Sequence, residues 1–107
     1  MKILLDECVT KRLKAHLKEF DVATVTEMGW NGLENGDLLN QCVENMFDIL
    51  LTIDKNLMFQ QNLEKYDVSI AVLNSVSSKL EELILFIPSF KRQTAYLKNQ
   101  KVYLIDK

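Results

Sequence analysis

The sequence predicts a three-layer α/β/α domain built on a mainly parallel, five-stranded sheet. Short apolar runs recur along the chain, and segments with helical spacing of apolar residues separate most of them. Strands that alternate with helices are typical of parallel sheets, whose crossovers are right-handed. The central run is apolar almost throughout, as expected for a strand covered on both faces. The predicted strands are residues 2–6, 22–25, 48–53, 68–73 and 102–105.

Helices are predicted between these strands from the spacing of apolar side chains. Residues 9–19 place apolar side chains on one side and Lys and Arg on the other. Residues 27–35 carry two glycines and predict a loop that leads to a helix beginning near Asp37. Residues 55–62 predict a short helix. A later helix over 80–87 is ended or kinked by Pro88 and resumes over 89–98.

Length and composition indicate one ordinary globular domain. A chain of 107 residues is long enough for a single core, and 48% hydrophobic with 26% charged residues is usual for soluble proteins. No apolar run is long enough to span a bilayer, and none is flanked like a secretory signal. We therefore expect residues 1–107 to form a single cytoplasmic domain without membrane contact.

The two cysteines, Cys8 and Cys42, lie among apolar residues on predicted helices. They lack the close pairing of a zinc site or a redox motif. We expect both to be free, buried thiols.

Three acidic residues are the main functional signal. Asp6 ends the first apolar run, Asp54 follows the third, and Asp37 opens the helix that leads into the third. In an open parallel sheet these positions lie on one rim, where ligands usually bind. Carboxylates gathered there repel one another unless a cation is present. The sequence therefore predicts Asp6, Asp37 and Asp54 as catalytic ligands of Mg²⁺ or Mn²⁺.

Such a site suits metal-assisted phosphodiester hydrolysis. Thr52, Lys55 and Asn74 are the predicted substrate-side residues. The Thr52 hydroxyl would orient a carboxylate, the Lys55 ammonium would meet a phosphate, and Asn74 would complete the site at the end of the fourth strand. The structural alternative stays open, because Asp6 and Asp54 also suit helix caps and Asp37 suits a helix dipole.

Charge alone does not indicate nucleic-acid binding, since the formal net charge is −2 and the pI is about 5.4. The end of the chain is nevertheless basic, and such a strip could face phosphates. Its cations are Lys91, Arg92, Lys98, Lys101 and Lys107.

Several stretches resemble the DUF5615 PIN-like family over most of residues 1–70. They are Ile3–Glu7 followed by a basic amphipathic helix, Thr24–Trp30, Asn35–Leu39, Phe47–Leu57 and Gln60–Leu63. The resemblance implies a compact PIN-like fold. Related PIN domains are Mg²⁺- or Mn²⁺-dependent ribonucleases, often toxins of bacterial toxin–antitoxin pairs. The resemblance places Asp6, Asp37 and Asp54 at the family's acidic positions. A fourth acid, usual late in full-length PIN nucleases, has no convincing equivalent here.

The leading hypothesis is therefore a metal-dependent ribonuclease that acts on RNA and pairs with an antitoxin-like protein. A non-catalytic PIN-like binding module is the main alternative. A receiver-like signalling domain is a weaker one, because Ser75 and Lys107 only loosely imitate the later receiver positions. Apolar residues around Leu85, Phe86 and Phe90, expected to be exposed, would suit a homodimer.

Overall fold

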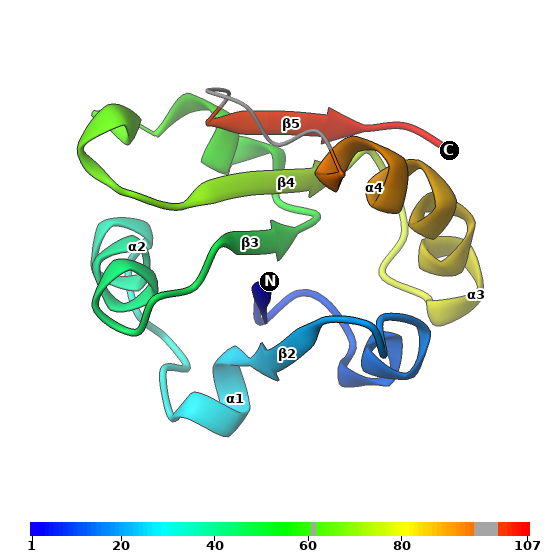
Figure 1. Cartoon of the computed structure of the whole chain (residues 1–107), viewed down its shortest axis with the longest axis horizontal. Helices are drawn as coiled ribbons and strands as arrows, with labels where there is room; N and C mark the ends of the chain where they lie inside the picture. The colour runs from blue at the N-terminus through cyan, green and yellow to red at the C-terminus, as the bar shows by residue number, and fades with distance from the viewer. Residues whose placement is uncertain (61, 96–100) are drawn as a thin grey trace.

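The computed structural model describes residues 1–60, 62–95 and 101–107. Within these ranges, five parallel strands form one sheet in the order β2–β1–β3–β4–β5. Figure 1 shows β2 and β5 at the two edges of this twisted sheet. The strands are β1 (Lys2–Leu5), β2 (Asp21–Thr24), β3 (Ile49–Thr52), β4 (Ser69–Leu73) and β5 (Val102–Ile105). The predicted α/β class and the predicted strands are confirmed.

Helices cover both faces of the sheet, because alternate residues of each inner strand point to opposite sides. On β3, Ile49 and Leu51 join one apolar cluster and Leu50 joins the other. The α-helices are α1 (Val25–Met28), α2 (Asn35–Glu44), α3 (Leu80–Leu83) and α4 (Ile87–Thr94). The 3₁₀ helices are η1 (Lys11–His16), η2 (Lys55–Phe59), η3 (Leu63–Lys65) and η4 (Ile84–Phe86). Residues of α2 and η2 pack with Leu50, and residues of η1, α3 and α4 pack on the opposite face.

The winding direction of the sheet changes between β1 and β3. The chain passes from β1 to β2 on one side, whereas β3 and the later strands lie on the other. The pairing of β1 with β3 continues past Leu5, since the Asp6 N–H donates to the Leu51 carbonyl at 2.9 Å. The carboxyl ends of β1 and β3 are therefore neighbours, where open sheets usually bind ligands.

The first helix is shorter than the predicted 9–19, and its caps explain why. Thr10 has an extended backbone and its hydroxyl accepts from the Arg12 N–H, so η1 begins at Lys11. Leu17 leaves helical geometry at the other end, with φ −129° and ψ 34°. The predicted apolar side is nevertheless buried, including Leu13 and Leu17.

Residues 27–35 are not a continuous loop. Thr24 caps the short helix α1, which includes Glu27 and Met28, and Gly29 ends it in the left-handed region with φ 77°. The late helical segment changes type before Pro88, which occupies the first turn of α4, where its missing N–H costs no helical bond. The predicted continuation over 89–98 holds to Thr94, and residues 96–98 lie outside the described residues.

Two burial predictions were wrong. Cys8 is exposed in a turn after β1, not buried on a helix, whereas Cys42 is buried on α2 as predicted. Phe86 and Phe90 are 1% and 0% exposed, because they face the sheet, and only Leu85 remains half-exposed. The apolar surface predicted for a homodimer is therefore mostly core. Among the described residues, no helix is long and apolar enough to cross a membrane.

Candidate functional site

The Thr52 hydroxyl joins the two predicted acids at the switch between β1 and β3. It donates to Asp6 Oδ2 at 2.7 Å and accepts from the Asp54 backbone N–H at 3.0 Å. Thr52 is fully buried, whereas Asp6 and Asp54 are partly exposed. A buried hydroxyl needs such partners, so Thr52 connects both acids to the sheet.

Replacing Thr52 by valine should lower the free energy of unfolding by about 1–3 kcal/mol, because the Asp6 carboxylate, the Asp54 N–H and the Cys8 thiol each lose a hydrogen-bond partner. The nearly isosteric Thr52→Val variant removes only the hydroxyl. Thr52→Ser is the matched control, since it keeps the hydroxyl and loses only a methyl group. Urea unfolding of the three proteins measures the difference. A Thr52→Val protein as stable as wild type would show that the hydroxyl does not organise this rim.

Asp54 also caps a helix, as the structural alternative predicted. Its Oδ1 accepts from the Asn56 N–H at 2.9 Å at the start of η2. Lys55 extends from the same turn, and its Nζ donates to the Ser75 carbonyl at 3.1 Å. Lys55 is exposed, and within the described residues this is the one hydrogen bond of its ammonium.

Asp6 and Asp37 are held differently. Asp6 does not cap η1, since Thr10 does so, and its Oδ1 accepts from the Glu7 N–H at 2.8 Å. Asp37 is exposed in the first turn of α2, a favourable place for a carboxylate near a helix N-terminus. Among the described residues, Asp37 makes no hydrogen bond or ion pair.

The three acids are not assembled into one cluster. In the ranges that the structure describes, no three His, Cys, Asp or Glu side chains are grouped so that they could hold a metal ion. The Asp6–Asp54 pair remains, on adjacent strand ends. Mg²⁺ is commonly bound through one or two carboxylates, with waters and substrate phosphates completing its shell. The pair fits a site of that kind, and a three-acid site stays a prediction.

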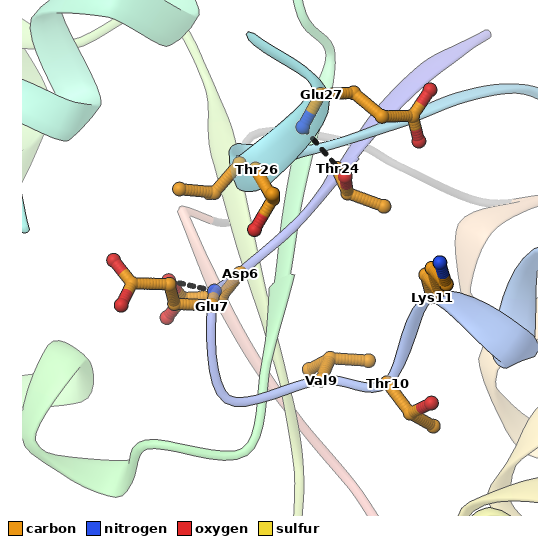
Figure 2. A pocket seen from close by; sticks show the side chains of 9 residues that line it. Asp6, Glu7, Val9, Thr10, Lys11, Thr24, Thr26 and Glu27 are labelled. Carbon is orange, nitrogen blue, oxygen red and sulfur yellow. Dashed lines mark hydrogen bonds between the residues drawn. The ribbon is translucent and has the colours of Figure 1, made fainter. Parts of the chain in front are cut away.

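A cavity of about 320 Å³ opens beside Asp6, between the ends of β1 and β2. Figure 2 shows Asp6 and Glu7 on one side of it and Thr10 and Lys11 on the other. The Glu7 side chain is held by the segment after α1, since its Oε1 accepts from the Gly32 N–H at 2.7 Å. The sequence places Glu7 next to Asp6 but carried no signal for this long-range contact.

Both cysteines lie close to Asp6. Cys8 Sγ is 3.4 Å from Thr52 Oγ1 and 3.8 Å from Asp6 Oδ2, a contact that the predicted helix did not suggest. Although the residue as a whole is exposed, desolvation of the Cys8 thiol raises its pKa above the usual value, with a smaller contribution from the charge of Asp6. The same causes raise the pKa of Cys42 to about 12. Both thiols are therefore protonated at neutral pH and are poor nucleophiles and metal ligands.

The remaining predicted residues are engaged elsewhere. Asn74 Nδ2 donates to Asp106 Oδ1 at 2.8 Å, on the β5 side of the rim. The basic end of the chain does not form one open strip. Lys91 pairs with Glu19, Lys107 pairs with Glu82, and Lys101 donates to the Tyr66 carbonyl; Lys98 lies outside the described residues.

Comparison of the chain with protein-family models, with curated proteins and with solved structures gives no match. The geometry of the switch between β1 and β3 therefore carries the functional interpretation.

Proposed function

We propose that the chain is a metal-dependent ribonuclease of PIN-like type, with Mg²⁺ or Mn²⁺ held by Asp6 and Asp54. The observation that carries this proposal is the pair of acids at adjacent strand ends, with the Asp6 carboxylate and the Asp54 backbone N–H both bonded to the buried Thr52 hydroxyl. A role as helix cap explains Asp54. It does not explain why the charged Asp6 lies at the usual ligand-binding position of an open sheet. The resemblance to DUF5615 PIN-like proteins favours RNA as the substrate.

The chain's own residues would position the reacting groups. The Thr52 hydroxyl holds the Asp6 carboxylate and the Asn56 N–H holds the Asp54 carboxylate, so that little reorganisation is needed when a cation and a phosphate arrive. Lys55 supplies a positive charge next to Asp54 for a substrate phosphate. When bound, the divalent cation would polarise a phosphoryl oxygen and lower the pKa of a water. Asp37 belongs to the proposal as a third, outlying acid.

The test is cleavage of a mixed-sequence, single-stranded RNA by the purified chain. We expect cleavage with Mg²⁺ or Mn²⁺, loss of cleavage in EDTA, and recovery when the metal is restored in excess. Cleavage that persists unchanged in EDTA would contradict a metal-dependent mechanism. The absence of cleavage under every metal condition, with RNA of several sequences, would favour the other candidate function.

That other candidate is a non-catalytic PIN-like module that binds a partner such as an antitoxin-like protein. It is favoured by the capping role of Asp54 and by the lack of a three-acid cluster in the described ranges. In a toxin–antitoxin pair, both functions could belong to the same fold. Metal binding separates them, because a purely structural cap needs no cation.

A further inference from the structure

The positive charge of η1 is concentrated in an otherwise acidic protein. Residues 10–18 contain Lys11, Arg12, Lys14 and Lys18 and no acid, although the chain carries a formal net charge of −2. A local excess of one charge sign attracts the opposite sign even when the net charge does not. In the predicted basic strip at the end of the chain, Lys91, Lys101 and Lys107 have partners, so residues 10–18 carry the larger group of open cations in the described ranges.

Ion pairs leave most of this charge available. Lys14 Nζ pairs with Glu27 Oε1 at 2.9 Å. Lys11, Arg12 and Lys18 are exposed and have no acidic partner within 4.0 Å among the described residues. Lys11 and Arg12 lie on η1 and Lys18 follows its end; we call these three cations the η1 strip.

The η1 strip meets the cavity that contains Asp6. A 3₁₀ helix has three residues per turn, so Lys11 and Lys14 lie one turn apart on the same side. Lys14 binds Glu27, and both Glu27 and Lys11 line the cavity beside Asp6. Figure 2 shows Lys11 across the cavity from Asp6 and Glu7. Lys11 therefore brings one open cation of the strip to the cavity beside Asp6.

The two surfaces suit different parts of a nucleotide. Asp6, Glu7 and Glu27 are among the residues that line the cavity, and of these only Glu27 has an ion-pair partner in the described ranges, so a phosphate is disfavoured beside Asp6 unless a cation is bound. Hydroxyl and carboxylate groups can instead bond to a neutral sugar or base. Phosphates are attracted to the exposed cations outside the cavity.

We propose that the η1 strip binds the phosphate backbone of a single-stranded RNA and guides it across the cavity to Asp6. This inference rests on the proposed function, because it takes RNA as the substrate of the same rim. The charge of the η1 strip determines the kind of partner, because three open cations attract a polyanion such as RNA.

Salt-dependent RNA binding tests the strip without any cleavage. The probe is a fluorescent single-stranded RNA in EDTA, with its affinity measured by anisotropy over a range of salt concentrations. Each lost phosphate contact should reduce the slope of log K against log salt by about 0.7. Arg12→Gln should therefore lower the slope by about 0.7, and Lys11→Gln/Arg12→Gln by about 1.4. Lys65→Gln removes an exposed cation on η3 and should leave the slope unchanged.

The outcomes separate the strip from the nuclease proposal. A slope that falls in the two η1 variants but not in Lys65→Gln supports RNA binding by the η1 strip, even if metal-dependent cleavage is never found. An unchanged slope in the double variant, an equal reduction in Lys65→Gln, or the absence of saturable RNA binding by wild type would overturn it. Metal-dependent cleavage with an unchanged slope would leave the nuclease proposal standing and place the RNA elsewhere.

Discussion

Asp54→Asn should lower metal-dependent RNA cleavage by at least about 100-fold, since even residues behind metal ligands commonly contribute 10- to 100-fold. The substitution separates the two roles of Asp54. Asparagine caps helices about as well as aspartate, so the start of η2 should be retained. The negative charge that would hold the cation is lost. Initial cleavage rates at saturating Mn²⁺ measure the effect.

The control for this variant is Asp67→Asn, which removes an exposed acid from the opposite rim. It should cleave RNA at the wild-type rate. Asp67→Asn should unfold in urea within about 0.5 kcal/mol of wild type, as exposed substitutions usually do, and Asp54→Asn should do the same because asparagine keeps the cap. Cleavage by Asp54→Asn at the wild-type rate would show that Asp54 acts only as a helix cap. The cleavage would then point to a contaminating nuclease.

Leu50→Ala should lower the free energy of unfolding by about 3–5 kcal/mol, as other large-to-small core substitutions do. Leu50 is fully buried in the middle of the sheet and pairs in register with Leu4 and Ile70. All three side chains belong to the same apolar cluster. A domain stability of about 5–15 kcal/mol leaves little margin for such a loss.

Leu85→Ala is the comparison for Leu50→Ala, since Leu85 is 50% exposed on η4. It should lower the unfolding free energy by less than about 1 kcal/mol, because little buried area is lost. Urea denaturation at one temperature measures both. Equal destabilisation by the two substitutions would contradict the placement of β3 at the centre of the sheet.

The sheet could be predicted because its signals are local. Residues 48–53 are apolar almost throughout, which is the pattern of a strand with helices on both faces. Helix lengths could not be predicted in the same way, since caps and backbone geometry set them. Thr10 starts η1 late, and Gly29 ends a helix that the sequence favoured as a loop. The burial of Phe86 depends on the direction of η4 relative to the sheet.

The site was predictable where it depends on strand ends. Asp6 and Asp54 follow β1 and β3, so neighbouring strands bring them to one rim. Thr52 was predicted to orient a carboxylate, and its bond to Asp6 agrees. The partners of Glu7 and Asn74 could not be predicted, because they join residues 25 and 32 positions apart through loop geometry.

The central claim is that Asp6 and Asp54 together hold a divalent cation, and calorimetric titration of Mn²⁺ tests it most directly. Wild type and Asp67→Asn should bind Mn²⁺ saturably. Asp6→Asn and Asp54→Asn should lose that binding while remaining folded, and Asp37→Asn should weaken it less than either. Absence of binding by folded wild type, or binding unchanged in both Asp6→Asn and Asp54→Asn, would contradict the account.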